Sequence, residues 1–71
     1  MSKELNVINL DGYEPEALNK QGWYLVTFFK SPENSRAFDL AMGKASTIEH
    51  DVGIRSYHKD EDMYYEVWEK W

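Results

Sequence analysis

Residues 53–70 read GIRSYHKDEDMYYEVWEK, and their pattern gives the first indication of the fold. Apolar and aromatic residues alternate with polar ones on both sides of a short acidic loop, which is the pattern of two strands in a hairpin. With a four-residue loop, Arg55 faces Glu66 and Tyr57 faces Tyr64. Opposite charges and paired rings directly across two strands stabilise such a register. The sequence therefore predicts an antiparallel hairpin at the end of the chain.

A long helix is predicted just before the hairpin, over residues 32–51. Ser31 suits the N-cap and Pro32 the first helical position, and Gly53 is expected to end the helix. Apolar residues recur at spacings of three and four, which defines one buried stripe. Ile54, Tyr65 and Val67 of the hairpin are expected to meet it. The stripe consists of Phe38, Ala41, Ala45, Ile48 and Val52.

The first half of the chain supplies two more strands and a short helix. Residues 23–30 are apolar on both faces and rich in aromatics, so we expect a central strand there. Residues 5–10 form a short strand, and residues 15–21 form a short helix that Gly22 ends. The predicted order is β-α-β-α-β-β. This order indicates an α+β fold: a two-layer sandwich with a mostly antiparallel sheet, in one domain of 71 residues.

Composition narrows the class of protein. The chain has no cysteine, which excludes disulfides and thiolate zinc sites. No apolar run approaches the roughly 20 residues of a membrane helix, and no signal peptide is visible, so we expect a cytoplasmic protein. The net charge of −5 disfavours direct binding to nucleic acid, because such binding depends on Lys and Arg neutralising phosphates. An acidic surface suits a protein partner with a basic surface.

The sequence lacks the patterns of common catalytic and metal sites. The glycines are scattered rather than gathered in a phosphate-binding loop, and no Ser lies in a nucleophile-elbow context. His50 has no second histidine at helical spacing. The acids after His58 lack the spaced ligands and glycine of a calcium-binding loop. We therefore predict no enzyme activity, no catalytic residues, no metal and no cofactor.

The side of the hairpin turned away from the long helix is rich in rings. At least two large apolar side chains of residues 23–30 are expected beside it. The rings on this side are Tyr57, Tyr64 and Trp68, framed by Arg55, Glu66 and Lys70. Three interpretations are open. The N-terminal strand and short helix cover these rings as ordinary core, the face pairs with its own copy in a homodimer, or it binds a different protein.

The leading hypothesis is a non-enzymatic acidic interaction domain that docks on a larger protein and modulates or inhibits it. In size, acidity and aromatic content the chain resembles small phage-encoded inhibitors of host machinery, which implies a viral protein and allows mimicry of nucleic acid toward a basic target. The alternative is a homo-oligomer that holds a small ligand between its subunits. The candidate protein-binding residues are Arg55, Tyr57, Tyr64, Glu66 and Trp68, with an acidic rim of Asp60, Glu61 and Asp62.

Overall fold

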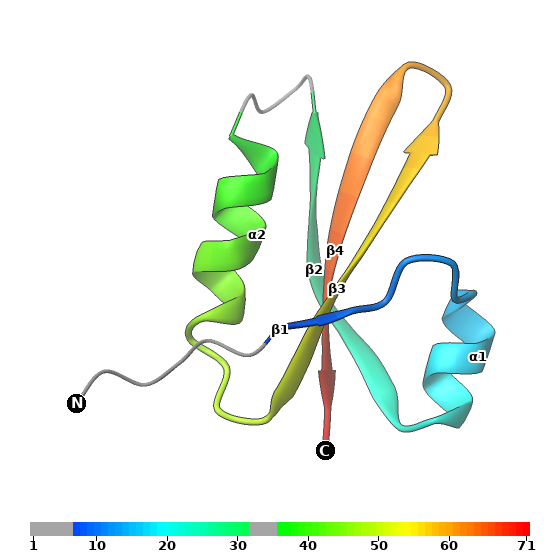
Figure 1. Cartoon of the computed structure of the whole chain (residues 1–71), viewed down its shortest axis with the longest axis vertical. Helices are drawn as coiled ribbons and strands as arrows, with labels where there is room; N and C mark the ends of the chain where they lie inside the picture. Colours follow the sequence, from blue (N-terminus) through cyan, green and yellow to red (C-terminus); the bar gives the residue numbers. More distant parts are fainter. Residues whose placement is uncertain (1–6, 32–35) are drawn as a thin grey trace.

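The computed structural model describes residues 7–31 and 36–71. It confirms the α+β class and the predicted order of strands and helices (Figure 1). No helix in these residues is long and apolar enough to cross a membrane. The elements are β1 (Val7–Asn9), α1 (Pro15–Lys20), β2 (Trp23–Ser31), α2 (Ala37–Ala45), β3 (Asp51–Lys59) and β4 (Asp62–Lys70).

The described strands form one sheet in the order β1-β3-β4-β2. β1 runs parallel to β3, whereas β3 and β2 both run antiparallel to β4, so the sheet is mostly antiparallel as predicted. The predicted hairpin register is confirmed: Arg55 lies opposite Glu66 and Tyr57 opposite Tyr64. The turn is shorter than expected, because Lys59 and Asp62 still pair and only two residues connect them. The first of these, Asp60, adopts a φ of 57°, a left-handed conformation that Asp tolerates better than most residues.

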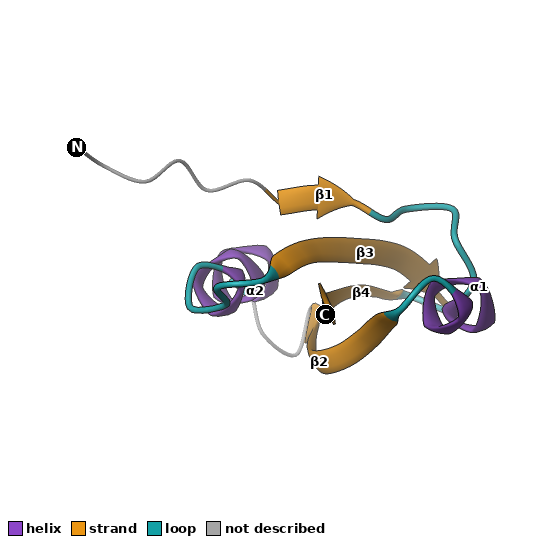
Figure 2. Ribbon diagram, turned by 90° about the horizontal axis from the view of Figure 1, so that it is seen from below, coloured by secondary structure: helices purple, strands orange, loops and turns teal. Residues whose placement is uncertain are grey.

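The two helices pack on opposite faces of the sheet. Ala41 and Ala45 of α2 belong to one buried cluster with Val67, whereas Leu18 of α1 belongs to a second cluster with Trp68. Neighbouring residues of a strand point to opposite faces, so Val67 and Trp68 place the two helices on different sides. Figure 2 shows α2 and α1 at opposite sides of the strands. We call the face turned away from α2 the outer face.

The long helix is shorter at its C-terminal end than predicted. The hydroxyl of Ser46 donates to the carbonyl of Gly43 at 2.6 Å, and that of Thr47 donates to the carbonyl of Lys44 at 2.7 Å. Such bonds compete with continued helical hydrogen bonding, and α2 ends at Ala45. Ile48 therefore follows the helix, although it still packs on the core with Ala45.

The buried stripe and the start of α2 also differ from the prediction. Ala41 and Ala45 are buried as expected, but Phe38 is 51% exposed and Val52 is buried as part of β3. Ser31 does not cap the helix, because it is the last residue of β2, and Arg36 occupies the N-cap of α2. The rest of the predicted start, residues 32–35, lies outside the described residues, as do positions 5 and 6 of the first predicted strand.

Gly53 does not end the helix but lies buried inside β3. A Cβ atom there would come within 2.6 Å of Leu10 Cδ1 and within 2.9 Å of the Ile8 carbonyl oxygen. The position therefore needs glycine so that the chain around β1 can approach β3. Gly22 does follow α1 in the left-handed conformation expected of it, with a φ of 95°.

The strand predicted to be central, β2, lies at an edge of the sheet. The β3–β4 hairpin takes the middle of the sheet, and the three-residue β1 takes the other edge. Residues on both faces of β2 can still be covered, because α2 packs on one face and α1 on one end of the other. A register shift between Leu25 and Thr27 marks an irregularity in its pairing with β4.

Candidate functional site

Three rings cross the outer face on three adjacent strands. Tyr57 and Tyr64 stack with their centroids 4.9 Å apart and their planes within 4° of parallel. Phe28 of β2 approaches Tyr64 at 6.1 Å in a tilted arrangement. Phe28 is 54% exposed, and the two tyrosines are half-buried. We call Tyr57, Tyr64 and Phe28 the aromatic row.

A polar network beneath the row holds its orientation. Arg55 donates from Nη1 to Glu66 Oε1 at 3.0 Å, and Trp68 donates from Nε1 to the same oxygen at 3.1 Å. The Arg55 side chain is only 13% exposed and that of Glu66 only 11%, so this ion pair is largely shielded from water. Arg55 also donates from Nε to the Tyr13 carbonyl at 2.6 Å. These bonds tie the segment before α1 to the hairpin.

Tyr57 is coupled to this network. The guanidinium carbon of Arg55 lies 4.6 Å from the centroid of the Tyr57 ring, which is cation–π geometry. Partial burial raises the pKa of the Tyr57 hydroxyl above its ordinary value of 10.0, and the negative charge and hydrogen bonding of Glu66 raise it further. Arg55 acts in the opposite direction on the same pKa. The hydroxyl is therefore neutral and able to donate at physiological pH.

Two predicted contact residues are not available at the surface. Trp68 lies on the outer face as expected, but it is only 3% exposed, because Leu10, Leu18 and Trp23 pack around it. Glu66 is likewise buried, between Arg55 and the indole of Trp68. The short helix thus covers Trp68 at one end of the outer face, as the interpretation of these rings as ordinary core required. It leaves the aromatic row at the other end open.

The predicted acidic rim lies at the tip of the hairpin. Asp60 and Glu61 form the exposed turn. Asp62 is partly shielded and lies 3.8 Å from the ammonium group of Lys30 on β2. The three acids adjoin the half of the outer face that carries Tyr57 and Tyr64, so the structure brings rim and row together.

The exposed residues of the edge strand were not among the contact residues that the sequence predicted. Leu25, on the outer face opposite Trp68, is 49% exposed, and Tyr24 is 55% exposed. Together with Phe28 they make β2 a long apolar edge. Natural edge strands are usually protected by charges, prolines or short length, and β2 has nine residues of which only Lys30 is charged. No local pattern distinguishes such a strand from a central one.

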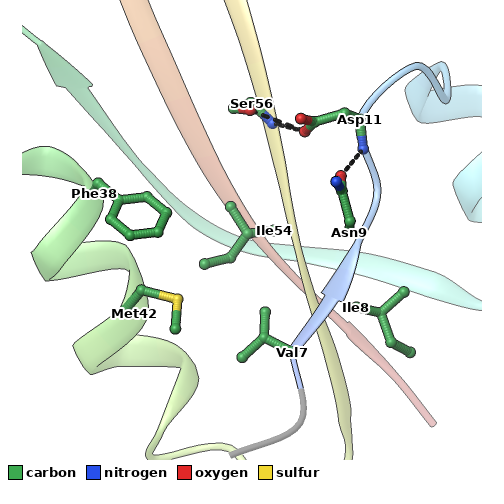
Figure 3. Close-up of a pocket in the computed structure, with 8 residues that line it drawn as sticks. All are labelled: Val7, Ile8, Asn9, Asp11, Phe38, Met42, Ile54 and Ser56. Carbon is green, nitrogen blue, oxygen red and sulfur yellow. Dashed lines mark hydrogen bonds between the residues drawn. The ribbon is translucent and has the colours of Figure 1, made fainter.

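A groove on the opposite face was also missed (Figure 3). It lies between β1 and α2 and has a volume of about 250 Å³. The Asp11 carboxylate at one end accepts hydrogen bonds from the amide and the hydroxyl of Ser56, at 2.7 and 2.9 Å. The lining residues are Val7, Ile8, Asn9, Asp11, Phe38, Met42, Ile54 and Ser56.

A more polar hollow of about 370 Å³ lies near the end of the chain, with His50 and Trp71 in its lining. Their rings approach to 3.7 Å between centroids, and Trp71 Nε1 donates to Glu69 Oε1 at 3.0 Å. His50 thus follows α2 rather than ending it, and lies against a ring. Within residues 7–31 and 36–71, no three His, Asp or Glu side chains gather where they could hold a metal ion.

Comparison with known protein families, with curated proteins and with solved structures finds no match.

Proposed function

We propose that this protein is a non-enzymatic interaction domain that docks on a larger protein through the aromatic row and modulates or inhibits it. The observation that carries the proposal is the open end of the outer face. There, the half-buried pair Tyr57 and Tyr64 continues into the exposed Phe28 on an edge strand. Tyr and Arg are enriched at the centres of protein interfaces, where a few such side chains carry most of the binding energy.

The network under the row supports this role. Arg55 is held by Glu66 and by the Tyr13 carbonyl, so the Tyr57 ring above it has little freedom to lose when a partner binds. A surface that is already ordered avoids much of the entropic cost of association. In this proposal Tyr57, Tyr64 and Phe28 make contact, while Arg55, Glu66 and Trp68 position them.

We infer a partner with a basic surface, met in the cytoplasm. The net charge of −5 and the exposed Asp60 and Glu61 beside the row favour approach of a positive surface. If that partner normally grips nucleic acid, the acidic rim occupies the place of phosphates, as in a viral inhibitor. Competition between this protein and a DNA duplex for the purified partner tests that extension.

The test compares two exposed apolar side chains on opposite sides of the molecule. Phe28→Ser removes the exposed ring of the row, and Leu40→Ser removes a side chain that is 41% exposed on α2. A partner is captured with the wild-type protein, identified by mass spectrometry and purified, and its dissociation constant is measured for both variants. We expect Phe28→Ser to weaken binding by about 30-fold, the effect of losing a residue that carries about 2 kcal/mol of binding energy. Leu40→Ser should leave binding within about twofold.

Equal binding by the two variants would place the contact elsewhere and reject the aromatic row. Loss of binding that tracks a fall in thermal stability would assign Phe28 to the fold rather than to an interface. Both measurements are therefore made on the same preparations.

The homo-oligomer is the second candidate, and the edge position of β2 favours it. Two copies can pair their β2 strands edge to edge, which would extend the sheet across both subunits and enclose a small ligand between the two rows. Leu25→Lys places a charge on the exposed edge and should return such a dimer to a monomer in light scattering. A wild-type monomer at all concentrations, with no rise in melting temperature on adding nucleotides or metabolites, rejects this candidate.

A further inference from the structure

The groove between β1 and α2 exists because α2 does not cover the whole of the sheet face on which it packs. α2 packs on β2, β3 and β4, and its Ala41 and Ala45 share a buried cluster with Ile54 of β3. In the groove beside this cluster, Val7 and Ile54 form an apolar floor, and Phe38 and Met42 form the wall on the helix side (Figure 3). The rings of Phe38 and Tyr65 form a T-shaped pair with centroids 5.6 Å apart, and Phe38 remains 51% exposed.

The size of the groove indicates what it can take. Sites for whole small molecules usually span about 300–1,000 Å³, whereas a dry cavity of about 150 Å³ is enough for benzene. A volume of about 250 Å³ lies between these two sizes. It fits one large aromatic or aliphatic side chain whose backbone remains outside the groove.

The Asp11 carboxylate at one end of the groove indicates which group should lie next to the bound side chain. Asp11 uses Oδ1 for both of its bonds to Ser56, and within the part of the chain that the structure describes no group donates to Oδ2. The backbone amide of Asp11 is in turn held by Asn9 Oδ1 at 2.8 Å, so the turn that carries the carboxylate is ordered from two sides. A fixed, exposed carboxylate beside an apolar groove, on a chain of net charge −5, favours a cation next to the apolar group.

We propose that this groove binds a basic peptide segment of a partner protein: one large apolar side chain enters between Phe38 and Met42, and a neighbouring Lys or Arg pairs with Asp11. This is a second contact, on the face of the sheet opposite the aromatic row, and it does not depend on the proposed role of the row. The two contacts are separable, because they share no residue: the groove residues lie in β1, in the turn after it, in β3 and in α2, whereas the row lies in β2, β3 and β4.

The test uses nitrogen-15-labelled full chain and end-capped tripeptides as probes. Lysine-phenylalanine-lysine presents the anchor and the charges. Lysine-alanine-lysine keeps the charges alone, and glutamine-phenylalanine-glutamine keeps the anchor alone. We expect the first peptide to shift the amide resonances of Val7, Ile54 and Ser56 and to bind at least about fivefold more tightly than either control, which corresponds to about 1 kcal/mol of apolar burial.

Variants then assign the contacts. Asp11→Asn keeps an acceptor for Ser56 but removes the charge, so it should weaken binding by up to about fivefold, as loss of an exposed ion pair does. Glu16→Gln, which removes the same charge from the exposed face of α1, should have no such effect. Phe38→Ser should weaken binding by a similar factor, and Leu40→Ser on the far side of α2 should not.

Four results would overturn the proposal. Shifts confined to Phe28, Tyr57 and Tyr64 would place the peptide on the aromatic row. Equal affinity for the phenylalanine and alanine peptides, or equal effects of Asp11→Asn and Glu16→Gln, would reduce the interaction to general charge attraction. Binding of free 2-phenylethylamine as tight as that of the phenylalanine peptide would reassign the groove to a small amine.

Discussion

The two ends of the outer face are built from the same strands, but one end is buried and the other is exposed to solvent. At one end, Trp68 is 3% exposed under Leu10 and Leu18, whereas at the other end Phe28 is 54% exposed. Both side chains are large and apolar, and both lie on the same side of the sheet. The difference shows that α1, a helix of six residues, is too short to cover more than one end. Ring content alone therefore does not distinguish buried rings from exposed rings in this chain.

Removing the covered ring should have the largest effect on stability. Trp68→Ala deletes an indole that is only 3% exposed and removes the Nε1 donor that Glu66 Oε1 accepts from. We expect a loss of about 3–5 kcal/mol in the free energy of unfolding, which is comparable with the whole stability of a small domain. Urea unfolding followed by circular dichroism measures it. A loss below about 1 kcal/mol, the value expected for Phe28→Ala at the open end, would erase the difference between the two ends.

A smaller loss is expected where the chain before α1 approaches the sheet. Gly53→Ala introduces a Cβ atom 2.6 Å from Leu10 Cδ1, so Leu10 and the Ile8 carbonyl must shift. Overpacking of this kind costs about 1–3 kcal/mol. Because Leu10 covers Trp68, the tryptophan fluorescence of the variant should also move toward longer wavelength. Unchanged stability and unchanged emission would mean that Leu10 does not hold that end closed.

The sequence predicts those features of the fold that depend on residues close together in the chain, and it does not predict those that depend on which distant segments pair. The register of Arg55 with Glu66 follows from alternation on both sides of one turn, and it was predicted correctly. The edge position of β2 depends on which strands pair, which no stretch of β2 encodes. A strand apolar on both faces is expected to be central, but here helices cover part of both faces of an edge strand.

Two further differences come from contacts that the apolar spacing of the sequence does not show. Gly53 has the spacing of a helix stop, yet its missing side chain serves the approach of Leu10, 43 residues earlier in the chain. Ser46 and Thr47 end α2 through their hydroxyl groups, although the apolar spacing continues through Ile48. The groove was not predicted for the same reason, because its walls come from three separate elements.

The smallest expected effect concerns pH at the open end. The pKa of Tyr57 is raised above 10.0 in the folded protein, so on titration the unfolded chain loses this proton first. The contribution of the protonated Tyr57 hydroxyl to the free energy of unfolding is fully present below about pH 10. It is lost as the pH rises through the folded-state pKa. Tyr57→Phe should therefore flatten the decline of melting temperature between about pH 10 and 11. An identical decline in both proteins would show that burial and Glu66 do not raise the pKa of the Tyr57 hydroxyl.

In our proposal, another protein covers the open end of the outer face. Amide hydrogen exchange, measured on the free protein and on its complex with the purified partner, tests that coverage. We predict that binding slows exchange in β2 around Phe28 and in the adjoining turn at Asp60 and Glu61, while the amides around Trp68 stay slow in both states. Slowing confined to α2 and β1, or no slowing in β2, would contradict the account.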